Sequence, residues 1–135
     1  MFEKINVEFK SCIIRDPVKR FVSAFKNRIL FHRDKEFYDH DVDLIIDKLE
    51  NGLFENKHFL PQNYWLGDNL NFFNIIGDVS NIENFTKEIN NFFGKKISFP
   101  KIQTGGKEFI ISLNIDQIKK IKKIYSDDYD LIGNR

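Results

Sequence analysis

The hydrophobic pattern changes abruptly near the start of the chain. Residues 5–14, INVEFKSCII, are rich in β-branched and aromatic side chains, which predicts a strand. Asp16-Pro17 then has the form of a helix N-cap followed by proline at the first helical position. From Val18 to Ile29 apolar residues recur at helical spacing, so an amphipathic helix is predicted directly after the strand.

A second amphipathic helix is predicted over residues 42–50, with Leu44, Ile45 and Leu49 on its buried face. The next segment, residues 53–70, has no clear hydrophobic period. It is therefore predicted to form a long loop, and loops of this length usually carry function.

The middle of the chain has the pattern of a strand followed by a helix. Residues 72–76 are predicted to form the strand, which would end in a turn at Gly77-Asp78. Ser80 with Glu83 matches a capping box, so a helix is expected from there to Phe93.

The final third contains one loop, one helix and a tail. Residues 95–109 include Pro100 and two consecutive glycines, which favours a loop. Asn114 is a suitable cap for a last helix, in which apolar residues continue in register to Tyr125. The polar end, residues 126–135, is expected to form a turn and a short tail.

This order of elements indicates an α/β fold that is helix-rich and has a small parallel sheet. The absence of repeats and linkers predicts a single domain over residues 1–135. An apolar strand with no earlier partner is typical of the middle of a parallel sheet, so the fold is expected to be incomplete at its N-terminus. An open sheet edge would favour self-association into a homo-oligomer.

The charge balance excludes a general attraction to nucleic acid. The chain carries 21 basic and 20 acidic residues, with a formal net charge of +1. Any anion site must therefore be local. The histidines and the single cysteine, Cys12, do not have metal-ligand spacing, so no metal site is expected.

The chain also has no sequence pattern of a membrane or secreted protein. A single cysteine cannot form an internal disulfide, and no apolar run approaches the roughly 18 residues of a membrane span. The first residues, MFEKINVEF, carry charges where a signal peptide needs its apolar core. These observations predict a cytoplasmic location.

Candidate phosphate chemistry lies at the end of the first predicted strand. Arg15 is placed where ligands bind in open α/β sheets, just before a helix N-terminus that favours anions. A guanidinium there can hold a phosphate through two hydrogen bonds, and Ser23 on the polar side of the helix can donate another. The alternative is a simple strand-to-helix turn with a surface ion pair.

The spacing RDPxxRxxSxF over residues 15–25 resembles the 3′-phosphate-binding motif of PAPS-dependent sulfotransferases of the Golgi carbohydrate type and their bacterial relatives. Phe25 stands where tyrosine is usual. Further along the chain, HFLPQ at residues 58–62, FNIIGDVSNIENF at residues 73–85 and YSDDYDLIG at residues 125–133 resemble the same family. These four segments occur in the family order.

The resemblance implies a P-loop-kinase-like, three-layer fold and a defined reaction. A sulfuryl group would pass from PAPS to a hydroxyl of a carbohydrate or similar acceptor. By the same resemblance, Arg15 and Ser23 would hold the 3′-phosphate of PAPS, and Arg20 would support their helix. Gly105, Gly106 and Lys107 are candidates for the loop that encloses the donor, because glycines let the backbone approach an anion closely.

The acceptor side is assigned to the predicted loop that contains HFLPQ. His58 and Gln62 are expected to face the acceptor, and His58 is the candidate base because it matches a family motif. Trp65 could stack on a sugar. The alternatives are a loop histidine that bonds the backbone and an aromatic side chain that anchors the loop in the core.

The family's N-terminal phosphate-cradling loop has no counterpart before Arg15. Two functions are therefore open for this chain. It is either a sulfotransferase domain truncated at the N-terminus or a non-catalytic binding or assembly module that retains the 3′-phosphate half of the site. The acceptor and the catalytic base are not fixed by the sequence.

Overall fold

A parallel pair of strands lies at the centre of the computed structural model, which describes residues 9–54, 56–99 and 105–133. Strand β1 (Ser11–Ile14) pairs with β2 (Ile75–Asp78), with Ser11 opposite Ile75 and Ile14 opposite Asp78. Helix α1 (Pro17–Ala24) leaves the carboxyl end of β1 and continues as a π-helical segment over Phe25–Phe31. The α/β class, helix-rich with a small parallel sheet, is thus confirmed.

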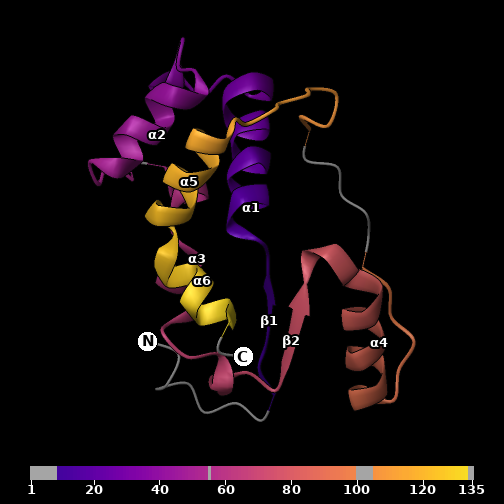
Figure 1. Cartoon of the computed structure of the whole chain (residues 1–135). Coiled ribbons are helices and arrows are strands. Elements are labelled where there is room, and N and C mark those ends of the chain that lie inside the picture. The colour runs from indigo at the N-terminus through magenta and orange to yellow at the C-terminus, as the bar shows by residue number, and fades with distance from the viewer. Residues whose placement is uncertain (1–8, 55, 100–104, 134–135) are drawn as a thin grey trace.

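The other helices lie on both sides of this pair. They are α2 (Val42–Glu50), α3 (Gln62–Leu66), α4 (Ile82–Phe93), α5 (Ile115–Ile124) and α6 (Ser126–Gly133). Helix α4 packs beside β2, whereas α2, α3, α5 and α6 lie on the β1 side (Figure 1). Within the described residues, no helix is long and apolar enough to cross a bilayer.

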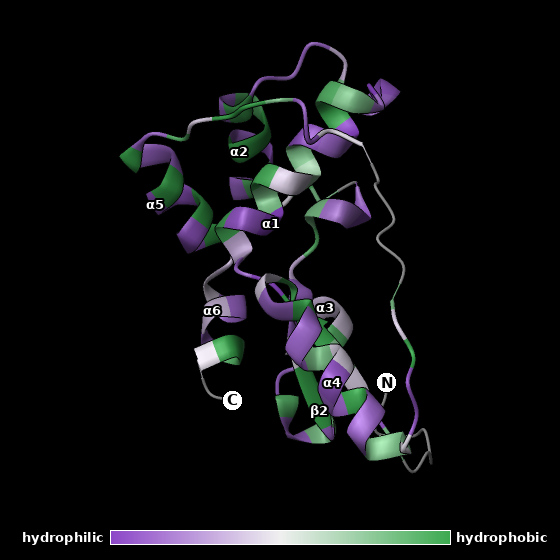
Figure 2. Ribbon diagram, turned by 90° about the vertical axis from the view of Figure 1, so that its right-hand side faces the viewer, coloured by the Kyte–Doolittle hydropathy of each residue, from purple (hydrophilic) through white to green (hydrophobic). Residues whose placement is uncertain are grey.

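The buried apolar side chains form two clusters, one around α1 and one that contains the buried residues of β1. The larger joins α1, α2 and α5 through residues such as Phe21, Ile46 and Ile121. Figure 2 shows hydrophobic and hydrophilic residues alternating along these helices, as amphipathic packing requires. The smaller cluster includes Cys12 and Leu131, and burial raises the pKa of the Cys12 thiol to about 11, so it packs as a neutral apolar group.

Several predicted elements are confirmed at their boundaries. Asp16 caps α1 by accepting a hydrogen bond from the Lys19 backbone N–H at 3.0 Å, and Pro17 is the first helical residue. Helix α2 spans the predicted residues, but its buried face contains Ile46 in place of Leu44, which is 41% exposed. Ile45, Ile46 and Leu49 together form the narrower stripe that meets the core.

The second strand begins three residues later than predicted and ends two residues later. Gly77 and Asp78 belong to β2 and do not form a turn. A Cβ at position 77 would collide with the Phe85 ring, so glycine here permits α4 to pack closely on the strand. The cap of α4 is Asn81, whose side chain accepts from the Asn84 backbone N–H, and the predicted Ser80 box does not form.

Two segments contain more helix than the sequence indicated. The predicted loop over residues 53–70 includes α3 and short 3₁₀ turns at Lys57–Phe59 and Leu70–Phe72. The predicted polar tail is helix α6, which buries Asp128 and Leu131. Residues 5–8 of the first predicted strand and residues 100–104 of the later loop lie outside the described residues.

Candidate functional site

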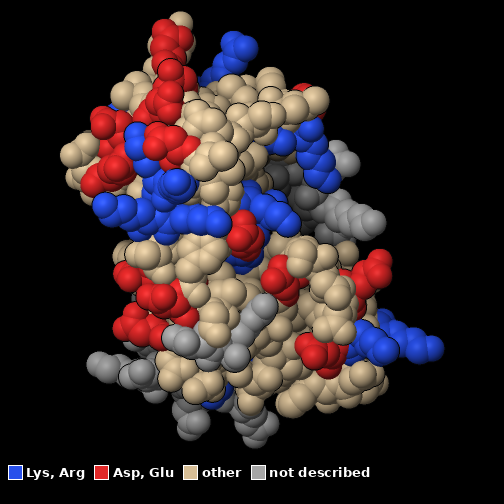
Figure 3. All heavy atoms as spheres, in the orientation of Figure 1, with Lys and Arg blue, Asp and Glu red and all other residues tan. Residues whose placement is uncertain are grey.

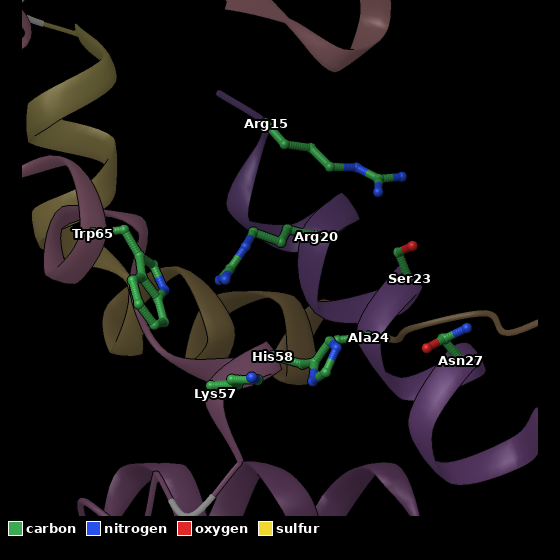
Figure 4. Close-up of a pocket in the computed structure, with 8 residues that line it drawn as sticks. All are labelled: Arg15, Arg20, Ser23, Ala24, Asn27, Lys57, His58 and Trp65. Atoms are coloured by element: carbon green, nitrogen blue, oxygen red, sulfur yellow. The ribbon is translucent and has the colours of Figure 1, made fainter. Parts of the chain in front are cut away.

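Arg15 and Ser23 lie side by side at the carboxyl end of β1. Arg15 directly follows the strand, and Ser23 lies on the polar face of α1. In Figure 4 both side chains extend toward the same side of α1. Among the described residues, neither the Arg15 guanidinium nor the Ser23 hydroxyl has a hydrogen-bond partner. Both side chains are therefore available to a ligand.

These two residues line a pocket of about 570 Å³, which we call the glycine-side pocket. Gly105, Gly106 and Lys107, which we call the glycine loop, also line it. Its other cations are Lys19, Lys26 and Lys107, and no acidic side chain contributes to its lining in the described residues. Val18, Val22 and Val79 add apolar surface. The volume lies within the range of small-molecule sites, and the charge favours an anion.

The glycine loop docks on the end of α1 through its backbone. Gly105 and Gly106 have φ values of +87° and +98°, which strongly favour glycine. The Asn27 side-chain amide donates to the Gly105 carbonyl at 3.2 Å, and a Cβ on Gly106 would lie 3.0 Å from the Lys26 backbone. The glycines thus permit the close approach that brings Lys107 to the pocket.

Arg15 and Ser23 also line a second pocket, of about 380 Å³, which we call the histidine-side pocket. It is completed by Arg20, Lys57, His58 and Trp65, together with Ala24 and Asn27. Arg20 extends from α1 toward Trp65 (Figure 4). The two pockets therefore meet at Arg15 and Ser23.

Arg20 lies on the histidine side and holds a neighbouring segment in place. Its Nη1 donates to the Leu60 carbonyl. Burial lowers the pKa of Arg20, while the nearby Tyr125 and Asp128 act in the opposite direction. The structure thus gives Arg20 a contact with the HFLPQ segment that the sequence did not indicate.

Gln62 is buried behind Arg15, away from both pocket linings. Its side-chain Oε1 accepts from the Arg15 backbone N–H at 2.9 Å, and its Nε2 donates to the Arg15 carbonyl at 2.7 Å. Both polar groups of the Gln62 amide are hydrogen-bonded. Together they satisfy the backbone N–H and carbonyl of Arg15, as a neighbouring strand would. This placement differs from the predicted contact with an acceptor.

Two residues near the C-terminus, Tyr125 and Asp128, hold the backbone around the HFLPQ segment through hydrogen bonds. The Tyr125 hydroxyl donates to the Phe59 carbonyl at 2.6 Å, and the Asp128 carboxylate accepts from the backbone N–H groups of Gln62 and Asn63, each at 2.8 Å. Asp128 is fully buried and caps α3 from another helix. Neither role was predicted from the sequence, because the hydrogen-bonded partners lie 65 or 66 residues away in the chain.

His58 lies at the surface and lines the histidine-side pocket. Its Nδ1 is 2.8 Å from the Asn56 side-chain oxygen. Burial, followed by the positive charge of Arg28, lowers the pKa of His58. Trp65 is 42% exposed at the same pocket, with Tyr64 edge-on to it at 5.0 Å between ring centroids.

The N-terminus of α1 is less open to an anion than the sequence predicted, because Asp16 occupies part of it. The Asp16 carboxylate already accepts one of its backbone N–H groups and also receives a hydrogen bond from the Tyr129 hydroxyl at 3.3 Å. An anion in the glycine-side pocket would therefore be held chiefly by side chains. Within the described residues, no group of three or more potential ligands could hold a metal ion.

The face of the molecule seen in Figure 3 carries charged side chains of both signs. In Figure 3, basic side chains form a band at mid-height, with acidic side chains above and below it. The cationic character of the two pockets is therefore local, as the net charge of +1 requires.

The chain has a cationic pocket at the carboxyl end of a parallel strand, which is where ligands bind in open α/β sheets. A family comparison identifies the chain, because the model of the sulfotransferase family matches residues 2–133. The chain belongs to the sulfotransferase family, which confirms the resemblance found in its motifs. No curated protein and no solved structure gave a significant match. The P-loop-kinase-like, three-layer arrangement and the single-domain assignment stay predictions.

Proposed function

We propose that this protein transfers a sulfuryl group from PAPS to a hydroxyl of a carbohydrate or similar acceptor. Family membership supports the sulfuryl transfer. The observation that carries the proposal is the position of Arg15 and Ser23, which form the shared wall of two adjoining pockets. A donor in one pocket would therefore lie directly beside an acceptor in the other, with its 3′-phosphate at that wall and its sulfuryl group further along the pocket.

The glycine-side pocket suits the donor. PAPS supplies the sulfuryl group together with a phosphate leaving group. The Arg15 guanidinium can bind the 3′-phosphate through two hydrogen bonds, and the Ser23 hydroxyl can donate a third. Lys19, Lys26 and Lys107 add positive charge, and of these three only Lys107 was among the predicted site residues. The three valines offer an apolar surface to the base.

The histidine-side pocket suits the acceptor. Trp65 presents an exposed ring on which a sugar can stack, and His58 presents an imidazole near the meeting point of the pockets. Arg20 and Lys57 provide fixed positive charge where negative charge accumulates during transfer. Gln62 acts indirectly in this proposal, because it positions Arg15 through two hydrogen bonds.

Calorimetric titration with adenosine 3′,5′-bisphosphate tests the donor site. Arg15→Ala and Ser23→Ala should each weaken binding, with the larger loss at Arg15 because it removes a charged, two-bond contact. Matched controls are Lys122→Ala and Ser112→Ala, which remove an exposed cation and an exposed hydroxyl elsewhere. Their affinities should equal that of the wild type.

A second assay separates an enzyme from a binding module. The wild-type protein is incubated with PAPS and a panel of carbohydrate acceptors, and sulfated product is measured. Product formation that falls in Arg15→Ala supports the transferase. Tight binding without any turnover would favour a non-catalytic module, and the failure of a folded wild type to bind would remove the donor site from the proposal.

A further inference from the structure

The His58 ring is held in a defined orientation by Asn56. The Asn56 Oδ1 accepts from the His58 backbone N–H at 2.9 Å and lies 2.8 Å from the His58 ring Nδ1. A single oxygen therefore contacts both the backbone and the ring of His58. What matters for chemistry is which of the two ring nitrogens carries the proton.

The orientation of the Asn56 amide is fixed by its other neighbours. Its Nδ2 donates to the Glu36 Oε1 at 3.0 Å and reaches the Asp34 Oδ2 at 3.5 Å. Ionised carboxylates only accept hydrogen bonds, so the NH₂ end must face them. A flipped amide would also place NH₂ against the backbone N–H of His58. The oxygen must therefore face the histidine.

The protonation of the ring follows from that orientation. The Asn56 oxygen can only accept, so the 2.8 Å contact is a hydrogen bond only if His58 Nδ1 carries the proton. In neutral imidazole the other nitrogen, Nε2, then has a free lone pair. Within the described residues, Nε2 has no hydrogen-bond partner, and His58 lines the pocket.

One of the carboxylates that Asn56 contacts, that of Asp34, is held in turn by Arg28 in the π-helical segment that follows α1. Arg28 binds Asp34 through two parallel contacts of 2.7 Å, from Nε to Oδ2 and from Nη2 to Oδ1. Such a paired arrangement fixes geometry better than a single charge contact. The carboxylate that orients Asn56 is therefore itself anchored.

We propose that Asn56 is a positioning residue that holds His58 as the Nδ1–H tautomer, so that Nε2 accepts the proton of the acceptor hydroxyl. The inference rests on the proposed function. As the acceptor oxygen forms its bond to sulfur, its proton moves to Nε2, and the bond from sulfur to the donor phosphate breaks with its electron pair on the phosphate. The resulting imidazolium donates both N–H groups, one of them still to Asn56.

The charges around the ring keep it neutral before reaction. Burial and the positive charges of Arg28, Lys57 and Arg20 lower the pKa of His58, while the negative charge of Asp34 acts against them. A base must be unprotonated to accept a proton, so a lowered pKa keeps it available at neutral pH. Asparagine, unlike aspartate, orients the ring without adding a negative charge.

Nitrogen NMR of histidine-labelled protein tests the tautomer without any ligand. The His58 signals are assigned by their loss in His58→Gln, since the chain has three histidines. Wild-type His58 should show a protonated Nδ1 and an unprotonated Nε2 above its pKa. Asn56→Ala should shift the ring toward a mixture of tautomers, and the control Asn51→Ala, an amide at the end of α2, should not. A wild-type ring protonated at Nε2, or one unchanged in Asn56→Ala, would overturn the inference.

Asn56→Asp sharpens the test through the pH profile. The carboxylate can still accept from Nδ1, so the tautomer should persist, but the added negative charge should raise the pKa of His58. The acid limb of kcat should move to higher pH in this variant, which a purely structural role would not produce. We expect a loss in kcat of about 100-fold in His58→Gln and about tenfold in Asn56→Ala.

The outcomes separate this inference from the proposed function. The expected tautomer together with full turnover in His58→Gln would refute the base role while leaving the donor and acceptor assignments intact. Absence of turnover in the wild type would count against the proposed function, and the NMR result would still decide whether Asn56 selects the tautomer.

Discussion

The two pockets share Arg15 and Ser23 but differ in how their outer walls are held. The histidine-side wall is fastened by buried hydrogen bonds from Tyr125 and Asp128 to the backbone of the HFLPQ segment. The glycine-side wall rests on the end of α1 through Gly105 and Gly106, which closely approach the Phe31 ring and the Lys26 backbone. The Asn27 amide also donates to the Gly105 carbonyl. The first wall is thus held by hydrogen bonds from another helix, whereas the second depends on the close backbone approach that glycine permits.

This difference suits two ligands with different demands. An acceptor hydroxyl must be aligned with a base, and alignment requires side chains that are fixed in advance. In the proposed reaction, an anionic donor would be attracted by the five cationic or hydroxyl side chains around the glycine-side pocket. The close backbone approach that glycine permits would let those side chains surround it.

The largest expected effect follows from removing the buried carboxylate. Asp128→Ala leaves two backbone N–H groups of α3 without their charged acceptor, which should cost about 2–4 kcal/mol of unfolding free energy. The control Asp127→Ala, at an exposed neighbour, should remain within about 0.5 kcal/mol of the wild type. Urea unfolding measures the free energy of unfolding of both variants. Equal values would show that Asp128 does not hold the histidine-side wall.

Gln62→Leu should affect both pockets, since Gln62 holds Arg15. The change leaves the backbone N–H and carbonyl of Arg15 without partners, at a cost of about 1–3 kcal/mol. Affinity for adenosine 3′,5′-bisphosphate should also fall, although Gln62 lines neither pocket. Asn63→Ala on the same helix serves as the control, and unchanged affinity in Gln62→Leu would show that Arg15 needs no such support.

Gly106→Ala should weaken only the glycine-side wall. Its φ of +98° strains any other residue, and the new Cβ would crowd the Lys26 backbone, so about 1–2 kcal/mol of local stability should be lost. Gly94→Ala is the control, since Gly94 also has a positive φ but open space around it. Titration should show weaker nucleotide binding in the first variant, with the His58 NMR signals unchanged in both.

The smallest expected effect is on the pH dependence of stability. A histidine whose pKa is lowered on folding contributes stability that is fully present above its unfolded pKa, near 6.5, and is lost as pH falls through the lowered value. His58→Gln should therefore flatten the acid side of the stability curve slightly. Parallel unfolding curves of the two proteins at descending pH would show the difference, and identical slopes would indicate no perturbed histidine.

The sequence predicted best what depends on neighbours along the chain. The Asp16-Pro17 start of α1 and the Asn114 cap of α5 involve contacts within three residues, and both form. The position of β2 depends on pairing with β1 more than 60 residues earlier, so the local pattern placed its start three residues too early. Likewise, the role of Gln62 depends on a partner 47 residues away.

Helix α6 was missed for a related reason. Its acidic, polar composition is typical of a solvated tail, and its hydrophobic stripe is narrow. Asp128 accepts hydrogen bonds from the first turn of α3, which is distant in sequence, so no local sequence pattern predicts this role. The candidate site was therefore predicted in its residue types, whereas the supports of Arg15 and His58 required the folded structure.

The bonds from Asp128 to α3 span 66 positions of the chain, and this separation sets the order in which the site can be assembled during synthesis. A ribosome releases the HFLPQ segment long before it releases residues 125–128. Until then, that segment lacks the partners that hold its backbone, while β1 and α1 have already emerged. The nascent protein can thus form helix α1 early, but it completes the wall that carries His58 only when translation reaches α6.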